Sequence, residues 1–182
     1  MGKTILAAGM IKQLGKVTLF VVPSLNLVKQ TLKVFTKHFG KRIVGTKAPK
    51  DQKKPIIIMN YQALKKKPKE WFDRFDLMIL DECHHGAADS IFDANKDKWT
   101  GIYYKYFLSA TPYRNDGSYL KLNAVIGDII FHYPLAQAVR DGWICPPTFL
   151  IYQMWNELLK DQGTFQEQYK SHIVRNEPRN DL

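Results

Sequence analysis

The chain has 182 residues, which is long enough to bury a proper hydrophobic core and suits one domain of ordinary size. Its apolar content of 45% and charged content of 24% are those of a globular protein. No run approaches the roughly 20 apolar residues of a membrane span, and no signal-peptide pattern opens the chain, so we expect neither a membrane protein nor a secreted one. Two cysteines, Cys83 and Cys145, are too few for a disulfide framework and suit a reducing cytoplasm. The formal net charge of +10 favours a polyanionic partner, although many basic proteins bind nothing of the kind.

Apolar residues with helical and strand-like spacing alternate along the chain. In chain order, we predict a helix at 3–15, a strand at 17–22, a helix at 25–39, strands at 42–44 and 55–59, a helix at 60–64, and strands at 77–80 and 104–108. A polar loop is expected at 47–54, and a polar helix or loop at 87–98. The rest is predicted as a helix at 120–126, a strand at 129–131, a helix at 135–140, a strand at 148–154, and a helical, then irregular segment to residue 182.

Alternating strands and helices, with strands that are almost continuously apolar, indicate a three-layer α/β fold with a mainly parallel sheet. Ligands bind such sheets at the carboxyl ends of the strands. Polar residues gather there in this chain, at Pro23-Ser24, Asn60-Tyr61-Gln62, Asp81-Glu82 and Ser109-Ala110-Thr111. The sequence therefore predicts a site at one edge of the sheet.

Two adjacent carboxylates follow the most apolar of these strands, Leu77-Met78-Ile79-Leu80. At the carboxyl end of a parallel strand, Asp81 can hold a hydrated magnesium ion through an oxygen. Glu82 points to the other side and can orient and deprotonate a water molecule. An acidic pair after an apolar run is a weak signal alone, because a solvated strand end gives the same pattern.

Gly2-Lys3-Thr4, directly before a helix-like run, strengthens that signal. It matches the second half of a phosphate-binding loop, in which the helix N-terminus attracts phosphate. In such a loop the lysine meets the β- and γ-phosphate oxygens and the threonine hydroxyl binds magnesium. The tripeptide is common by chance, but a later buried strand that ends in Asp-Glu is the expected companion.

Together these motifs resemble the first motor domain of superfamily 2 helicases and translocases of the DExH kind. Gly2-Lys3-Thr4 is similar to motif I, Val22-Pro23-Ser24 with Leu27 and Gln30 to motif Ia, Asp81-Glu82-Cys83-His84 to motif II, and Ser109-Ala110-Thr111-Pro112 to motif III. The segments at 113–117, 126–127 and 138–142 resemble the restriction-enzyme and repair branch of that superfamily. The resemblance covers residues 2–154 and rests on four motifs in the family's order.

The resemblance implies a RecA-like P-loop domain that uses ATP and Mg²⁺. Gly2, Lys3 and Thr4 would bind the nucleotide phosphates, and Thr4 and Asp81 would hold the magnesium ion. Glu82 would activate the attacking water, so Lys3, Asp81 and Glu82 are the expected catalytic residues.

The resemblance also implies residues that couple the nucleotide to domain closure and residues that contact nucleic acid. The expected coupling residues are His84, Ser109 and Thr111, the last two through hydrogen bonds to the motif II carboxylates. The expected nucleic-acid contacts, made through short polar groups and backbone N–H groups, are Pro23, Ser24, Asn60, Tyr61 and Gln62. DNA is favoured as the partner by the sequence after motif III, with RNA as the alternative.

The family pattern extends beyond this chain at both ends. Its first motif I glycine and the strand before it would precede Met1, and a second motor domain, which carries arginine fingers, would follow. We therefore expect a fragment, a truncated gene or a start codon assigned too late. Residues 1–154 would form the N-terminal motor domain, and 155–182 would lead to the missing second one. The isolated chain is expected to hydrolyse ATP very slowly or not at all.

The main hypothesis is thus an ATP-dependent motor domain that moves on DNA, cytoplasmic or nucleoid-associated, with a nuclease or repair protein as a further partner. The alternative is a catalytically incomplete remnant that binds nucleic acid or a partner protein without turnover. Cys83-His84-His85 matches no four-ligand zinc pattern. The lysine clusters at 47–54 and 65–69 are read as solvated loops or, less favoured, as nucleic-acid contacts.

Overall fold

The computed structural model describes residues 2–51, 53–83, 94, 96–110, 127–148 and 164. The chain divides into two compact units, Met1–Ile130 and Phe131–Leu182. The first unit contains the described strands and carries the residues of the predicted site.

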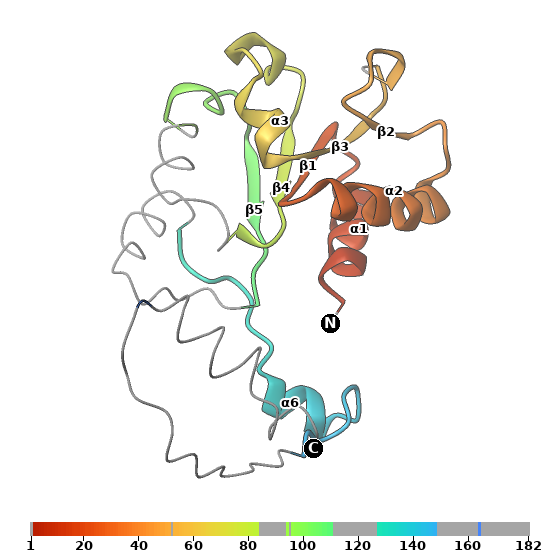
Figure 1. Cartoon of the computed structure of the whole chain (residues 1–182), viewed down its shortest axis with the longest axis vertical. Helices are drawn as coiled ribbons and strands as arrows, with labels where there is room; N and C mark the ends of the chain where they lie inside the picture. Colours follow the sequence, from red (N-terminus) through yellow and green to blue (C-terminus); the bar gives the residue numbers. More distant parts are fainter. Residues whose placement is uncertain are drawn as a thin grey trace. The chain divides into compact units, whose positions relative to one another are not determined.

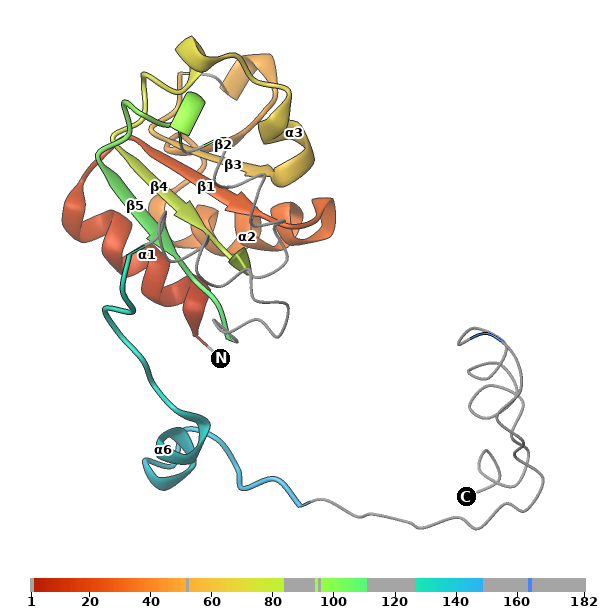
Figure 2. The same cartoon turned by 90° about the vertical axis from the view of Figure 1, so that its left-hand side faces the viewer.

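A five-stranded parallel sheet forms the centre of the first unit (Figures 1 and 2). Its strands are β1 (Thr18–Val22), β2 (Val44–Thr46), β3 (Ile56–Asn60), β4 (Leu77–Leu80) and β5 (Tyr104–Phe107). They lie in the order β2-β3-β1-β4-β5, and every pair is parallel. Because all five run the same way, the residues that follow them meet at one edge of the sheet.

Helices cover one face of this sheet. They are α1 (Lys3–Leu14) and α2 (Leu25–Phe39), and Figure 2 shows both on the same side. Gly15 ends α1 in the left-handed region at φ 60°, where glycine carries little strain. Ser24 begins α2, since its hydroxyl accepts a hydrogen bond from the Leu27 amide at 3.3 Å. The opposite face carries α3 (Tyr61–Lys65) and the 3₁₀ turn η2 (Lys69–Trp71), while a second 3₁₀ turn, η1 (Pro49–Asp51), follows β2.

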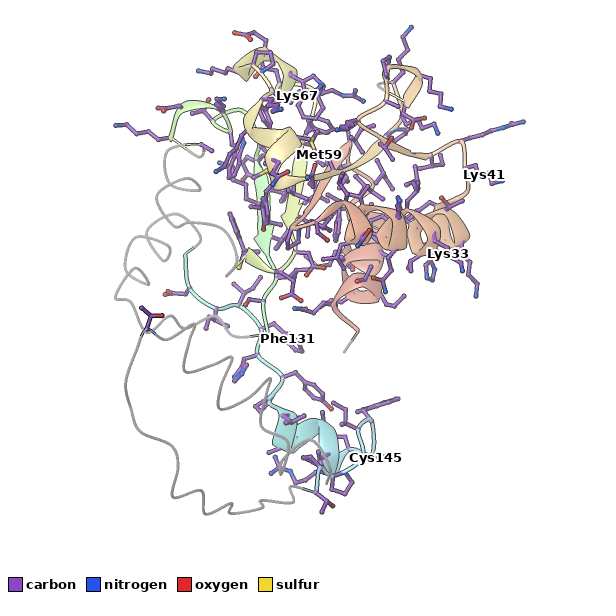
Figure 3. All side chains as sticks on the ribbon, viewed as in Figure 1. Lys33, Lys41, Met59, Lys67, Phe131 and Cys145 are labelled. Atoms are coloured by element: carbon purple, nitrogen blue, oxygen red, sulfur yellow. The ribbon has the colours of Figure 1, made fainter. Side chains whose placement is uncertain are left out.

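Alternate residues of each inner strand enter two separate apolar clusters, one on each face. Phe20, Ile58 and Ile79 pack with Phe35 of α2. On the other face, the buried side chains are those of Leu19, Val21, Ile57, Met59, Met78 and Leu80, packed with Leu64, Phe72, Phe75, Trp99 and Ile102. Met59 is labelled in Figure 3. Strands buried on both faces confirm the predicted three-layer α/β fold.

The predicted elements are confirmed for α1, α2, α3, β1, β3, β4 and β5. The strand predicted at 42–44 is wrong in position: β2 forms at Val44–Thr46, because Gly40–Ile43 make a turn and the Asp51 carboxylate fixes the Thr46 amide at 2.9 Å. The strand predicted at 129–131 is also wrong. Ile130 is 81% exposed, and the described part of the chain gives this run no partner strand.

Some of the predicted elements fall wholly or mostly on residues that the structure does not describe. The helix predicted at 120–126, the strand predicted at 148–154, the segment 155–182 and the domain boundary at 154 lie outside the described residues, apart from Thr148 and Thr164. The polar helix or loop expected at 87–98 is described only near its end, where Ala94, Lys96 and Asp97 are helical.

The second unit is described at 131–148 and at Thr164. It contains the predicted helix α6 (Leu135–Arg140), which ends before Gly142 at φ 74°. The Tyr133 hydroxyl donates a hydrogen bond to the Asp141 carboxylate, which joins the two ends of this short helix. No helix within the described ranges is long and apolar enough to cross a membrane.

Candidate functional site

The clearest feature of the carboxyl edge is an ion pair between Lys3 and Glu82. The Lys3 Nζ atom lies 2.5 Å from Glu82 Oε1, and the side chains are 27% and 28% exposed. Lys3 is the first residue of α1, and Glu82 follows β4 by two residues. The fold therefore brings together two predicted site residues that lie far apart in the sequence.

The start of α1 has the features of an anion-binding helix end. Gly2 precedes it at φ 96°, a conformation that favours glycine. No side chain caps this end and its first turn carries no acidic residue. The first amides of a helix lack intrahelical partners and attract anions, while Thr4 is half-buried in the same turn.

The turn after β4 holds the two carboxylates in fixed positions. Asp81 is 8% exposed, and its amide donates to the Val21 carbonyl at 2.8 Å. Its Oδ1 atom accepts the Glu82 amide at 3.0 Å. Glu82 has a φ of 50°, which is left-handed and costs a residue other than glycine on the order of 1–3 kcal/mol. This strained turn directs the Glu82 side chain toward Lys3.

Tyr61 connects this turn to the end of β3. Its hydroxyl donates a hydrogen bond to the Asp81 carbonyl at 2.9 Å. Burial raises the pKa of the Tyr61 phenol well above its usual range, and the nearby acidic groups of Cys83, Asp81 and Glu82 add to the effect. The hydroxyl therefore stays a donor. The sequence suggested a nucleic-acid contact for Tyr61, but it did not suggest this inward hydrogen bond.

Cys83 completes the turn as a core residue. It is 4% exposed, and its amide donates to the Leu108 carbonyl at 3.1 Å. Burial raises the pKa of the thiol to about 11. The group is therefore a neutral thiol at physiological pH, which suits packing better than nucleophilic chemistry.

A cavity of about 250 Å³ lies beside the ends of β1 and β3. Val22 pairs with Asn60 in the register of these strands, which brings the segments after them together. The lining residues are Pro23, Ser24, Leu25, Asn26, Asn60 and Gln62. Four of the five predicted nucleic-acid contacts thus line one cavity. Asn26 was missed, and its place in the first turn of α2, beside Ser24, was the signal for it.

The predicted coupling residues are only partly described. Ser109 is half-buried and follows β5 by two residues, at the same edge as Asp81. His84 and Thr111 lie outside the described residues.

This parallel sheet, with a lysine-led helix and an Asp-Glu turn at its carboxyl edge, defines an α/β domain of the RecA-like class. Residues 1–114 match the family described as the type III restriction enzyme, res subunit. That match covers more than half of the chain, and the chain belongs to this family.

The curated relatives include helicases and a translocase. The chain is 28% identical over 132 residues to the DNA 3'-5' translocase XPB2 of Sulfurisphaera tokodaii, an alignment that covers 71% of this chain and 29% of the relative. It is 27% identical over 139 residues to the ATP-dependent DNA helicase uvsW of Enterobacteria phage T4, with 71% and 27% covered. The chain therefore spans less than a third of these two relatives.

Solved structures show the same fold at low identity. A crystal structure of T4 UvsW matches with a TM-score of 0.63 at 22% identity, covering 70% of this chain and 28% of that one. The Hef helicase domain of Pyrococcus furiosus matches with a TM-score of 0.55 at 19% identity, covering 69% of this chain and 31% of that one. These likenesses establish the RecA-like fold.

Proposed function

We propose that this chain is the ATP-binding part of a motor that couples ATP hydrolysis to movement on DNA. The observation that carries the proposal is the contact between Lys3 and Glu82 at the carboxyl edge of a parallel sheet. The names of the two relatives, a DNA translocase and an ATP-dependent DNA helicase, support the choice of DNA and ATP.

In this proposal the start of α1 binds the nucleotide phosphates through its free amides and through Lys3. Thr4 and Asp81 provide hydroxyl and carboxylate oxygens, the ligands that Mg²⁺ prefers, and these residues fit such an ion. A bound Mg²⁺ would neutralise charge on the phosphates. The Glu82 amide holds Asp81 Oδ1, so the carboxylate keeps one orientation.

The Lys3–Glu82 ion pair suggests how binding prepares hydrolysis. Glu82 holds the Lys3 ammonium at 2.5 Å, and the phosphates compete for that ammonium because they carry more negative charge. Once Lys3 turns to the β- and γ-phosphates, the Glu82 carboxylate is released to accept a proton from the attacking water. The left-handed turn at Glu82 keeps the carboxylate aimed at the same region.

The cavity beside β1 and β3 is the proposed contact for the DNA backbone. Ser24, Asn26, Asn60 and Gln62 carry hydroxyl and amide donors, which bind phosphate oxygens without reading base sequence. Tyr61 stands between this cavity and the carboxylate turn, because it follows Asn60 and bonds to Asp81. It is a positioning residue through which DNA at the cavity would affect Glu82.

Single-turnover hydrolysis, with the chain in excess over labelled ATP, tests this function. We expect slow hydrolysis with Mg²⁺ and DNA that Glu82→Gln lowers about 10²–10⁴-fold, the usual contribution of a general base. Glu70→Gln, at an exposed glutamate on η2, is the matched control and should change nothing. Hydrolysis that survives Glu82→Gln contradicts the assigned role. ATP binding without any hydrolysis supports the non-catalytic alternative instead.

A further inference from the structure

Three lysine-rich connections enter strands of the sheet at the edge opposite Lys3 and Glu82. The described residues of 47–54 lead into β3, residues 65–76 into β4, and residues 96–103 into β5. Because the strands are parallel, the starts of β3, β4 and β5 share the amino edge. Figure 3 shows Lys67 at the end of the sheet away from the start of the chain marked in Figure 1.

Cations that donate to backbone carbonyls hold these connections against one another. The Lys98 ammonium donates to the carbonyls of Lys65 and Lys67, both at 3.2 Å. The Arg74 guanidinium, in the connection before β4, donates to the Lys54 carbonyl at 2.9 Å. The three connections therefore form one surface, although they are separate in sequence.

The lysines of this surface fall into two groups. Lys54, Lys67 and Lys98 are half-buried and hold the structure: Lys54 pairs with Asp51 at 2.8 Å, and Lys67 lies 4.9 Å from the Trp71 ring centroid. The others are exposed, and we call them the amino-edge lysines: Lys47, Lys50, Lys53, Lys65, Lys66, Lys69 and Lys96. The exposed acids of the same connections are Glu70, Asp73, Asp76 and Asp97. Cations outnumber anions on this surface.

The composition of the surface indicates what would bind it. Protein interfaces have cores enriched in aromatic residues and methionine and poor in lysine. Trp71, the aromatic side chain of η2, is packed against Phe75 at 4.9 Å and beneath Lys67, so it offers no free apolar anchor. On the described part of this edge, seven exposed lysines against one exposed aromatic side chain, Tyr103, suit a phosphate backbone, which in duplex DNA carries one charge per roughly 1.7 Å.

We propose that the amino-edge lysines form a second, sequence-independent contact for the nucleic-acid backbone. This contact lies on the edge away from the Lys3–Glu82 pair and from the cavity at Ser24 and Asn60. A duplex bound there would add an affinity for DNA that falls with rising salt and does not depend on whether ATP is bound. Like the proposed function, this contact concerns nucleic acid, but it uses different residues and does not depend on ATP binding.

The test compares two triple variants that change the net charge equally. Lys66→Gln, Lys69→Gln and Lys96→Gln remove three amino-edge lysines. Lys29→Gln, Lys33→Gln and Lys37→Gln remove three exposed lysines of α2 and form the control. Binding of a fluorescently labelled duplex is measured by anisotropy over a range of salt concentrations, after circular dichroism has confirmed that both variants are folded.

The slope of log K against log salt should become shallower in the amino-edge variant, by about 0.9 for each DNA phosphate that the protein no longer neutralises, while the α2 variant keeps the wild-type slope. Equal slopes and affinities for the two variants would overturn the proposal. Poly-glutamate that competes as well as DNA for the wild type, but not for the amino-edge variant, would identify an acidic polypeptide as the partner instead. Nucleotide titrations of wild type and Lys3→Ala judge the proposed function separately.

Discussion

Removing the Tyr61 hydroxyl tests the link between the cavity and the carboxylate turn. Tyr61→Phe deletes one oxygen and leaves the ring, which packs against the core cluster that includes Leu64 and Cys83. The substitution removes the 2.9 Å hydrogen bond to the Asp81 carbonyl. Any effect can therefore be traced to one donor.

The size of the effect follows from the burial of the acceptor. A typical intramolecular hydrogen bond contributes about 0.5–1.5 kcal/mol net, but a buried carbonyl that loses its donor costs about 1–3 kcal/mol. Asp81 is 8% exposed. We therefore expect Tyr61→Phe to lower the free energy of unfolding by about 1–3 kcal/mol.

Urea unfolding followed by circular dichroism measures this change. Tyr103→Phe is the matched control, because the Tyr103 side chain is 83% exposed, and it should change stability by less than about 0.5 kcal/mol. An equal, small effect of both substitutions would refute the reasoning.

A second measurement addresses function. Coupling between two sites is reciprocal, so DNA should alter the affinity for ATP by the same factor as ATP alters the affinity for DNA. We expect Tyr61→Phe to reduce this factor while each ligand alone binds nearly as to wild type. If the variant keeps the full coupling between ATP and DNA binding, or if wild type shows none, the hydrogen bond does not couple the two sites.

Three further predictions concern the stability of the same unit. Hydrogen bonding to Lys54 lowers the pKa of Asp51 below 3.8, so this carboxylate stabilises the fold above that pH and the stabilisation is lost as pH falls. The loss of unfolding free energy in Asp51→Asn, measured by urea unfolding, should therefore shrink below about pH 4. A loss that stays constant with pH would contradict this. Burial raises the Cys83 pKa from 9.0 to about 11, so the contribution of the neutral thiol to stability is full below pH 9 and is lost as the pH rises to about 11. In urea unfolding, Cys83→Ala should therefore lose less stability than wild type between these two pH values. A Cβ at Gly45 would lie 2.6 Å from Asp51 Cβ, so Gly45→Ala should cost about 1–3 kcal/mol, whereas Gly9→Ala, with open space around it, should stabilise by about 0.4–1 kcal/mol in thermal melts.

Much of this fold was predictable because its strands are short apolar runs ended by polar residues. Val22 and Leu80 each close such a run, and a parallel sheet brings the following residues to one edge. The meeting of Lys3 with the Asp81-Glu82 turn follows from that topology, given the motif at the start of α1. The local pattern of apolar residues was sufficient to predict the strands, because their burial on both faces determines where they form.

The details that were missed depend on tertiary contacts. Ile43 and Val44 are β-branched residues typical of a strand, but the Asp51 carboxylate binds the Thr46 amide and places the strand later. The left-handed backbone of Glu82 has no local signal, because glutamate does not favour that conformation. The inward hydroxyl of Tyr61 likewise depends on a carbonyl that the chain reaches only at Asp81.

Titration of Mg-ATP into the chain tests the central claim most directly, because the claim places the triphosphate on Lys3. Lys3→Ala should weaken ATP binding at least tenfold, a loss of about 1.4 kcal/mol, which is the low end for a hydrogen bond to a charged group. Lys12→Ala, which removes an exposed lysine from the last turn of the same helix, should bind ATP as wild type does. Equal affinities of Lys3→Ala, Lys12→Ala and wild type would contradict the assignment of this edge as the nucleotide site.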